Sequence, residues 1–432
     1  MQREGDHGGG GGIVIYTKEP LKLKGEIMNI VNINNDKFKT NILAIFLSTK
    51  LDKENVAKNA LLPAVLRRGS KDYPTMRDLS KRLEELYGAR FDCGVSKKGE
   101  LQVIRFYTET INDKLLDSKE NLLEEAKKLL NSIIFNPLIE NGRFNDDYIE
   151  QEKRKVKDII ASKKNDKVQY ALEHCYEIMC EGEPFELSEF GTPEMIDAVT
   201  NEELVETYYN MINNYDVQIF ISGNEIPNEL GEGFAFGSKE KNTIEENVIN
   251  VYEQKNVTED MDVNQGKLSL GYRTNIFPKS EDYYSLLVMN GVLGGGVHSK
   301  LFQNVREKNS LAYYVFSRMD KFKGIMGISC GIESENHDKA LETILEQVAD
   351  IKAGKITKEE FDTTIKTIEN SLKSMQDEQV QVLDFYYGQS LIGDDTTVEE
   401  VLEKVKKVTV EDVIEVSKKL QLDTVYFLKP RV

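Results

Sequence analysis

The sequence predicts an α+β protein built from two similar halves, and an internal repeat is the first reason. The segment that begins Val199-Thr200 recurs as Val408-Thr409, roughly 210 residues later in a chain of 432 residues. A stretch rich in Glu, Asn, Lys and Gly, with little periodicity, separates the halves between residues 223 and 266. Because 432 residues are too many for one hydrophobic core, we expect at least two domains.

Each copy of the repeat predicts a helix followed by a strand. Thr200 and Thr409 are N-cap candidates, since a Thr hydroxyl accepts a hydrogen bond from the first helical turn. Acidic residues follow each Thr, where they favour the positive end of the helix dipole. The β-rich runs 216–220 and 423–427 then close the two copies.

Upstream of each copy, the sequence predicts a pair of helices. In the first half these span residues 122–134 and about 145–163, and in the second half residues 340–353 and 358–375. Strands are expected over further segments of both halves, namely 40–48 and 101–108 in the first and 267–273 and 324–331 in the second. Strands interspersed with paired helices predict an α/β sandwich in each half, with a mostly antiparallel sheet and helices on one face.

Charge and composition narrow the function classes. The formal net charge of −18 argues against a nucleic-acid partner, because phosphate contacts need a surplus of Lys and Arg. The charge is compatible with attraction of basic peptides or with an acidic surface that favours solubility. No apolar run approaches the ~20 residues that cross a bilayer, and no secretion signal is apparent. We therefore expect a cytoplasmic protein without a membrane partner.

The expected domain organisation follows from these patterns. Residues 1–26 are expected to form a partly disordered tail, of which Met1 to Gly12 is Gly-rich and polar. Residues 27–225 and 265–432 are expected to form the two domains, joined by a linker over residues 226–264.

Cysteines and histidines give no sign of a disulfide framework or a metal site. The four cysteines form no Cys-x-x-Cys pair and are expected to be free, buried thiols in a reducing compartment. His174, His298 and His337 lie far apart in the sequence, so we interpret each as a surface or core-edge residue.

Residues 59–70, which read NALLPAVLRRGS, carry the first resemblance to a known family. This segment is similar to the zinc-binding helix of the M16 (pitrilysin-like) metallopeptidases, which reads His-x-x-Glu-His followed by apolar residues, a basic residue, Gly and Thr or Ser. The helix and terminal Gly88-Ala89 that follow also fit that family. The resemblance implies two M16/LuxS-like sandwich domains.

The chemistry of the family's zinc site is missing from this frame. Ala60 and Ala64 stand at the two His positions, and Pro63 stands at the position of the catalytic Glu. In active members, positions i and i+4 share a helix face and converge on zinc. Alignment of residues 152–156 with the family's pattern places Ile159 at the third ligand. We therefore expect no metal ligands and no catalysis by this chain on its own.

The second half keeps a long motif that the family uses for substrate. Residues 290–313 resemble the M16 signature Leu-Gly-Gly-x-x-Ser-x-Leu-Phe-x-x-x-Arg-Glu-Lys-x-x-Leu-Ala-Tyr. The resemblance assigns Arg306 and Tyr313 to the Arg/Tyr pair that holds a peptide substrate at the zinc site of a facing domain. Both side chains can donate hydrogen bonds to a peptide carbonyl or its oxyanion. Taken alone, Arg306 could instead end a solvated helix and Tyr313 could begin a strand.

The glycines of this motif have two interpretations. Gly294, Gly295 and Gly296 lack the Lys-Ser/Thr ending of a phosphate-binding loop. In the inactive subunit of the mitochondrial processing peptidase, a Gly-rich loop in the corresponding region helps to bind substrate. A tight turn between helices is equally compatible with the sequence.

The resemblance implies the non-catalytic subunit of a heterodimeric M16 zinc peptidase. The partner would be an M16 chain with an intact His-x-x-Glu-His motif, and it would carry the zinc. This chain would bind peptide substrate through Arg306 and Tyr313. The bacterial subgroup that it resembles is associated by name with the 5-aminopentanol modification of elongation factor P. The alternatives are a non-enzymatic M16-derived scaffold and a lone metallopeptidase with unusual ligands, which would contain stoichiometric zinc.

Overall fold

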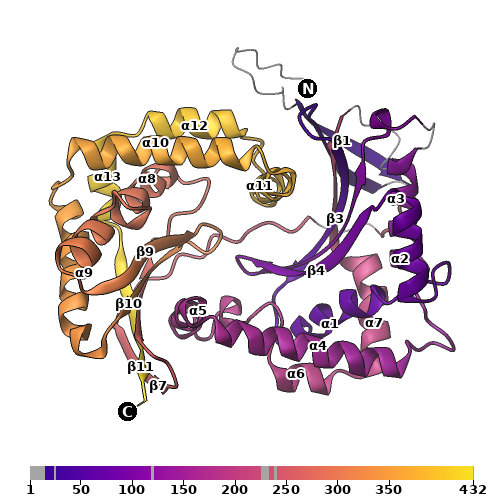
Figure 1. Ribbon diagram of the computed structural model, residues 1–432, viewed down its shortest axis with the longest axis horizontal. Coiled ribbons are helices and arrows are strands. Elements are labelled where there is room, and N and C mark those ends of the chain that lie inside the picture. The colour runs from indigo at the N-terminus through magenta and orange to yellow at the C-terminus, as the bar shows by residue number, and fades with distance from the viewer. Residues whose placement is uncertain (1–14, 24–25, 118–120, 225–232, 238–240, 432) are drawn as a thin grey trace. The chain divides into compact units, whose positions relative to one another are not determined.

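The computed structural model describes residues 15–23, 26–117, 121–224, 233–237 and 241–431 (Figure 1). The chain forms two compact units. The first unit contains residues up to Ile160, Leu187–Thr243 and Gln379–Gly388. The second contains Ala161–Glu186, Ile244–Glu378 and Gln389–Val432.

A six-stranded sheet forms the centre of the first unit, in the order β1-β2-β6-β3-β5-β4. Only the β2–β6 pair is parallel, and the other neighbours are antiparallel. The strands are β1 (Ile15–Leu23), β2 (Glu26–Asn34), β3 (Thr40–Lys50), β4 (Arg90–Lys98), β5 (Leu101–Ile111) and β6 (Asp216–Gly223).

The second unit contains a five-stranded sheet, in the order β7-β11-β8-β10-β9. Its β7–β11 pair is parallel and its other pairs are antiparallel. The strands are β7 (Lys255–Met261), β8 (Gly266–Arg273), β9 (Ala312–Asp320), β10 (Ile325–Ile332) and β11 (Gln421–Pro430).

The two sheets repeat each other strand for strand. In chain order, β2 to β6 correspond to β7 to β11, with the same neighbours and the same parallel pair. The predicted α+β class and the internal repeat are therefore confirmed. The strands predicted over residues 40–48 and 101–108 are β3 and β5, and those predicted over 267–273 and 324–331 are their counterparts β8 and β10.

The helices repeat in the same way. The first half has α1 (Val56–Leu66), α2 (Met76–Glu85), α3 (Leu122–Phe135), α4 (Asp146–Asn165), α5 (Lys167–Met179), α6 (Pro193–Ala198) and α7 (Asn201–Asn214). The second half has α8 (Tyr283–Gly294), the π-helix η4 (Phe302–Lys308), α9 (His337–Lys352), α10 (Lys358–Met375), α11 (Gln379–Ile392), α12 (Val398–Lys406) and α13 (Val410–Ser417). Short 3₁₀ segments lie at Asp113–Leu115, Pro184–Glu186 and Ser334–Asn336.

The predicted N-caps of the repeat are confirmed. The Thr200 hydroxyl accepts from the Glu203 amide, and the Thr409 hydroxyl accepts from the Asp412 amide. In both copies the acidic side chain accepts a hydrogen bond from the backbone amide of the N-cap Thr, which completes a capping box. Each cap fixes where α7 or α13 begins.

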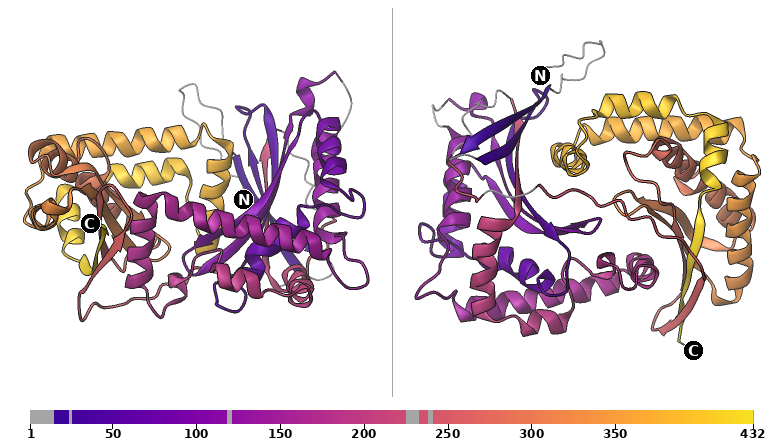
Figure 2. Two further views of the ribbon diagram at one scale, coloured as in Figure 1. Left: turned by 60° about the horizontal axis from the view of Figure 1, so that its bottom comes forward. Right: turned by 180° about the vertical axis from the view of Figure 1, so that it is seen from behind.

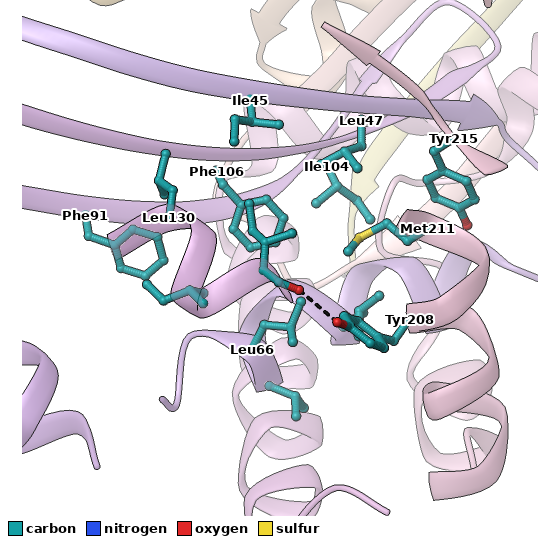
Figure 3. Close-up of a cluster of buried hydrophobic side chains, with 14 of the residues drawn as sticks. Ile45, Leu47, Leu66, Phe91, Ile104, Phe106, Leu130, Tyr208, Met211 and Tyr215 are labelled. Atoms are coloured by element: carbon teal, nitrogen blue, oxygen red, sulfur yellow. Dashed lines mark hydrogen bonds between the residues drawn. The ribbon is translucent and has the colours of Figure 1, made fainter. Parts of the chain in front are cut away.

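The main core of the first unit lies between its sheet and one layer of helices. Ile45 and Leu47 of β3 point toward α3 and α7, where they meet Leu130 and Met211 (Figure 3). The Tyr208 hydroxyl donates to the Ile134 carbonyl at 3.0 Å, so this buried phenol is satisfied (Figure 3). Helices α2 and α3 lie on the same side of this sheet (Figure 2).

The opposite face of each sheet is covered by a helix from the other half of the chain. Residues 161–186, which contain α5, belong to the second unit, and α5 packs on β8, β10 and β11. Residues 379–388 of α11 belong to the first unit. Figure 1 shows α5 on the side of the second sheet away from α8 and α9. The predicted single helical layer is thus supplemented by an exchanged helix in each unit.

The exchanged part of α11 is held on the first sheet by aromatic and polar contacts. The Tyr387 ring stacks on Phe46, with centroids 4.0 Å apart. The Gln379 amide donates to the Thr40 and Ser222 carbonyls at 3.2 and 3.0 Å. Lys98 of β4 forms an ion pair with Asp384 at 2.7 Å. These contacts join the second half of the sequence to strands of the first.

A buried charge cluster holds the exchanged segment 161–186 on the second sheet. The Glu183 carboxylate binds Arg273 of β8 at 2.6 Å and Lys323 at 2.5 Å, and Arg273 also binds Asp423 of β11 at 3.1 Å. Arg273 donates a further bond to the Met179 carbonyl of α5 at 2.6 Å. Burial raises the pKa of Glu183, but the hydrogen bonds from Arg273 and Lys323 outweigh it, and the pKa is lowered.

The predicted domains are continuous stretches of sequence joined by a linker over residues 226–264, and these limits remain a prediction. The two units described above are defined instead by packing. Of the predicted tail over residues 1–26, residues 1–14 lie outside the described residues and Ile15–Leu23 form β1. In the described part of the chain, no helix is both long and apolar enough to cross a bilayer.

We expect Glu183→Gln to lower the free energy of unfolding by about 3 kcal/mol, because it leaves two buried cations with one carboxylate fewer. Since the folded-state pKa of Glu183 is lowered, its contribution is present above the ordinary Glu pKa and is lost as pH falls through the folded-state pKa. Urea denaturation followed by circular dichroism at neutral and acidic pH measures both effects.

Glu181→Gln is the matched control, because the Glu181 side chain is 77% exposed and pairs with Lys255 at 3.3 Å. We expect it to change the free energy of unfolding by less than about 1 kcal/mol. Equal effects of the two substitutions would contradict the role given to the buried cluster.

Candidate functional site

The degenerate zinc-binding motif lies on α1, in the first unit. Ala60 and Pro63 are buried in this helix, and Ala64 is partly buried against the same core. Pro63 has no N–H to donate to the preceding turn, although α1 continues past it to Leu66. None of these three side chains has an atom that can bind a metal ion.

A buried hydrogen-bond network fixes the start of this motif. The Asn59 amide donates to Gln102 at 2.9 Å and accepts from the Tyr215 hydroxyl at 2.6 Å. Gln102 donates in turn to the Val56 and Glu189 carbonyls. These bonds tie α1 to β5 and to Tyr215 at the end of α7, so the helix keeps its position without a metal.

The polar groups around Pro63 are occupied by contacts within the protein. The Cys93 thiol donates to the Pro63 carbonyl at 3.1 Å, and burial raises the pKa of Cys93 to about 12. A thiol with this pKa remains protonated at neutral pH and is a poor metal ligand. Glu152 of α4 is buried and pairs with Arg68 at 2.5 Å and with Lys155 at 2.8 Å.

Ile159 stands at the position predicted for the third zinc ligand. Its side chain lies on α4 and is 44% exposed, so the position carries an apolar group near solvent. Within the described residues, no three His, Cys, Asp or Glu side chains are grouped in a way that could hold a metal ion. The side chains of this chain therefore do not fit the zinc that its motif frame implies.

The second-half motif begins at the end of α8, where Gly294 is required for packing. A Cβ atom at Gly294 would lie 2.4 Å from the Ser317 amide nitrogen on β9. A Cβ at Gly295 would lie 2.6 Å from the Gly291 Cα. Gly296 accepts a hydrogen bond from the Ser299 hydroxyl at 2.6 Å. Gly294 thus brings α8 close to β9, and substrate contact by the three glycines remains a prediction.

Arg306 lies on the π-helix η4, which follows this turn. Such segments are rare and occur often at functional sites. Val305 anchors η4 in the core, whereas the Arg306 side chain is 42% exposed. Its guanidinium lies over the Phe302 ring at 4.8 Å from the centroid and 3.7 Å from the Glu307 carboxylate. The side chain therefore presents its donors close to solvent.

Tyr313 occupies a β-bulge near the start of β9. Gly331 of β10 pairs with Tyr314 and Ile332 pairs with Ala312, so Tyr313 has no partner in the ladder. Bulges occur beside active sites, where they redirect a side chain. The Tyr313 side chain is 51% exposed, and its hydroxyl donates to Glu333 at 2.5 Å. This hydrogen bond raises the pKa of Tyr313, while Gln265 acts in the opposite direction.

Arg306 and Tyr313 lie on η4 and β9 of the second unit, and both side chains are exposed. In the described part of the chain they are not joined by a hydrogen bond, and each is held by its own neighbour, Glu307 or Glu333. Glu333 belongs to no recognised motif, so sequence patterns alone do not single it out. Only the pairing of β9 with β10 brings it to Tyr313.

The fold and these sites define a class: two repeated α+β units with a motif frame of a zinc peptidase but without its ligands. The family described as "Peptidase M16 inactive domain" matches residues 198–368. The chain is 37% identical over 419 residues to "Probable inactive metalloprotease YmfF" of Bacillus subtilis, a match that covers 96% of this chain and 98% of that protein. The chain therefore belongs to the M16 peptidase family.

Solved structures share the fold of this chain. A conserved protein from Enterococcus faecalis has a TM-score of 0.86 and 32% identity, and the match covers 94% of this chain and 96% of that one. A peptidase M16 inactive domain from Pseudomonas fluorescens has a TM-score of 0.78 at 16% identity, and the match covers 96% and 98% of the two chains. The second likeness supports the fold alone.

We expect EDTA to leave the thermal midpoint of the purified chain unchanged. A ligand that binds only the folded state raises the midpoint, so removal of a structural zinc would lower it. The measurement is differential scanning calorimetry with and without EDTA, with zinc content determined by mass spectrometry. Stoichiometric zinc together with a lower midpoint in EDTA would contradict the assignment of α1 and α4 as a metal-free site.

We expect Gly294→Ala to lower the free energy of unfolding by about 1–3 kcal/mol, because its Cβ would overlap the β9 backbone. Gly94→Ala is the matched control, since a Cβ there meets no atom within 4 Å, and we expect a change within about 0.5 kcal/mol. Chemical denaturation measures both. A stable Gly294→Ala chain would remove the packing explanation for this glycine.

Proposed function

We propose that this chain is the non-catalytic subunit of a heterodimeric M16 zinc peptidase and supplies Arg306 and Tyr313 to bind peptide substrate. One contrast carries the proposal. The four zinc-site positions Ala60, Pro63, Ala64 and Ile159 carry no group that can bind zinc or act as a base, whereas the second-half motif keeps Arg306 and Tyr313 and both are exposed.

The two retained side chains suit a role in binding a peptide carbonyl. A guanidinium carries several N–H donors and a permanent positive charge, and a phenol adds one O–H donor. Donors aimed at a carbonyl oxygen stabilise the negative charge that develops during peptide cleavage. The π-helix and the bulge support this role, because each presents one of these donors to solvent.

The proposed partner is a second M16 chain with an intact His-x-x-Glu-His motif, which would bind zinc and perform the cleavage. The B. subtilis relative, named a probable inactive metalloprotease, supports the assignment of this chain as the inactive member. We place the complex in the cytoplasm, consistent with four free cysteines. The subgroup's association with elongation factor P modification makes that process the first place to seek substrates.

We expect Arg306→Ala and Tyr313→Phe each to lower kcat/KM of the reconstituted complex at least tenfold. This change corresponds to about 1.4 kcal/mol of transition-state stabilisation. Assembly should be unaffected, because both side chains are exposed. The measurements are cleavage of a quenched fluorescent peptide library and size-exclusion chromatography of each variant complex.

Lys308→Ala is the control, since Lys308 is an exposed cation at the end of the same π-helix. It should retain the wild-type kcat/KM. Unchanged turnover in both the Arg306 and Tyr313 variants would rule out substrate binding by this pair. That result would favour the non-enzymatic scaffold, in which the motif has no role in catalysis.

A further inference from the structure

The Tyr313 hydroxyl is already engaged by a carboxylate that the M16 motif does not include. Glu333 directly follows β10, and the bulge in β9 brings Tyr313 to it across the sheet end. Both residues are exposed, so a ligand can reach them. The bond therefore lies in the position where the proposed function requires a free donor.

We propose that Glu333 determines substrate specificity, holding the Tyr313 hydroxyl until a ligand takes it and then binding a positive charge on that ligand. The ligand class is a basic peptide, with a Lys or Arg side chain or a free N-terminus close to the carbonyl bound by Tyr313. This inference rests on the proposed function, because it assumes that Tyr313 contacts substrate.

Glu333 and a peptide carbonyl would compete for the single proton of the Tyr313 hydroxyl. A phenol has a single O–H donor. While Tyr313 donates to Glu333, it cannot donate to a peptide carbonyl. The raised pKa of Tyr313, caused first by its bond to Glu333, agrees with a hydroxyl held in its protonated form. A substrate must therefore displace Glu333 from the hydroxyl.

Displacement by a peptide leaves the negative charge of Glu333 without its partner. When a peptide covers the site, Glu333 loses its bond to Tyr313 and some of its water, and an unpaired carboxylate is costly in such a position. Lys267 is close enough to Glu333 to interact with it electrostatically, but the two form no ion pair among the described residues. Lys267 is only 8% exposed and lies 5.6 Å from the centroid of the Tyr314 ring.

A cation on the ligand satisfies Glu333 in this state. An ammonium or guanidinium restores the donors that the carboxylate has lost. A neutral peptide would leave the carboxylate unpaired, and an acidic peptide would add repulsion. The chain's net charge of −18 attracts basic peptides from a distance but does not determine which residue binds them. A local test must therefore keep the net charge constant between variants.

The test compares Glu333→Gln with Glu335→Gln, an exposed control two residues away with the same change in charge. The probes are a fluorescein-labelled peptide of Lys and Ala and the same peptide with Gln in place of Lys. Fluorescence anisotropy with the reconstituted complex, treated with EDTA so that the partner does not cleave the probes, gives both dissociation constants. We expect Glu333→Gln to reduce the preference for the Lys peptide at least threefold, about the size of one exposed ion pair, and Glu335→Gln to reduce it less.

A second readout reports on the Tyr313 hydroxyl itself. In the chain labelled with ¹³C-tyrosine, NMR titration gives the pKa of Tyr313, assigned by its absence in Tyr313→Phe. We expect Glu333→Gln to lower this pKa, since the carboxylate raises it in the wild type. A purely structural role for Glu333 would not couple this pKa to peptide preference.

Two failures are distinguishable. If Arg306→Ala and Tyr313→Phe weaken peptide binding but Glu333→Gln and Glu335→Gln alter the preference equally, the specificity role is overturned and the proposed function stands. If the wild-type complex binds neither peptide, or if Arg306→Ala and Tyr313→Phe leave its binding unchanged, the proposed function fails and the specificity role fails with it.

Discussion

The exchange of α5 and α11 between the halves of the chain is the constraint on which the rest of the structure depends. Each sheet has one face covered by its own helices and the other by a helix from the other half. The buried contacts of Glu183 with Arg273 and Lys323 hold one exchanged segment, and the Phe46–Tyr387 stack holds the other. Neither unit is therefore a continuous stretch of sequence, and each needs both halves of the chain to complete it.

The region of the degenerate zinc motif is held in place by contacts within the protein. Asn59, Gln102 and Tyr215 connect α1 to the sheet through buried hydrogen bonds, and Pro63 is accommodated within the helix. Arg68 and Lys155 together neutralise Glu152, a buried carboxylate of α4. The contacts that hold α1 and α4 thus form without zinc, and the exposed donors that we propose for peptide binding lie at η4 and β9 of the second unit.

Much of the fold could be predicted from local patterns, because those patterns act over a few residues. Thr200 and Thr409 mark helix starts through their own hydroxyls, and residues 358–375 were predicted with the bounds of α10. The strands corresponding to β3, β5, β8 and β10 were recognised from short β-rich runs. The exchange of α5 was not predicted, because its partners on β8 and β11 are far away in the sequence.

The site was predictable only in part, for the same reason. Arg306 and Tyr313 were found because a long motif surrounds them. The absence of zinc ligands at Ala60, Pro63, Ala64 and Ile159 followed from a separate motif frame, at residues 59–70 and 152–156. Glu333 has no motif, and its contact with Tyr313 depends on the register of β9 against β10 and on the bulge between them. The strand β1 lay in a segment whose composition resembled a tail.

We propose that this chain works as the inactive half of an M16 pair, and its partner is the direct test of that role. The most direct measurement is affinity purification of the tagged chain from its native host, with mass spectrometry of the proteins recovered in near-equal amount. The account predicts a second M16 chain with an intact His-x-x-Glu-His motif. Recovery of this chain with only proteins of other families, and without any such M16 chain, would contradict it.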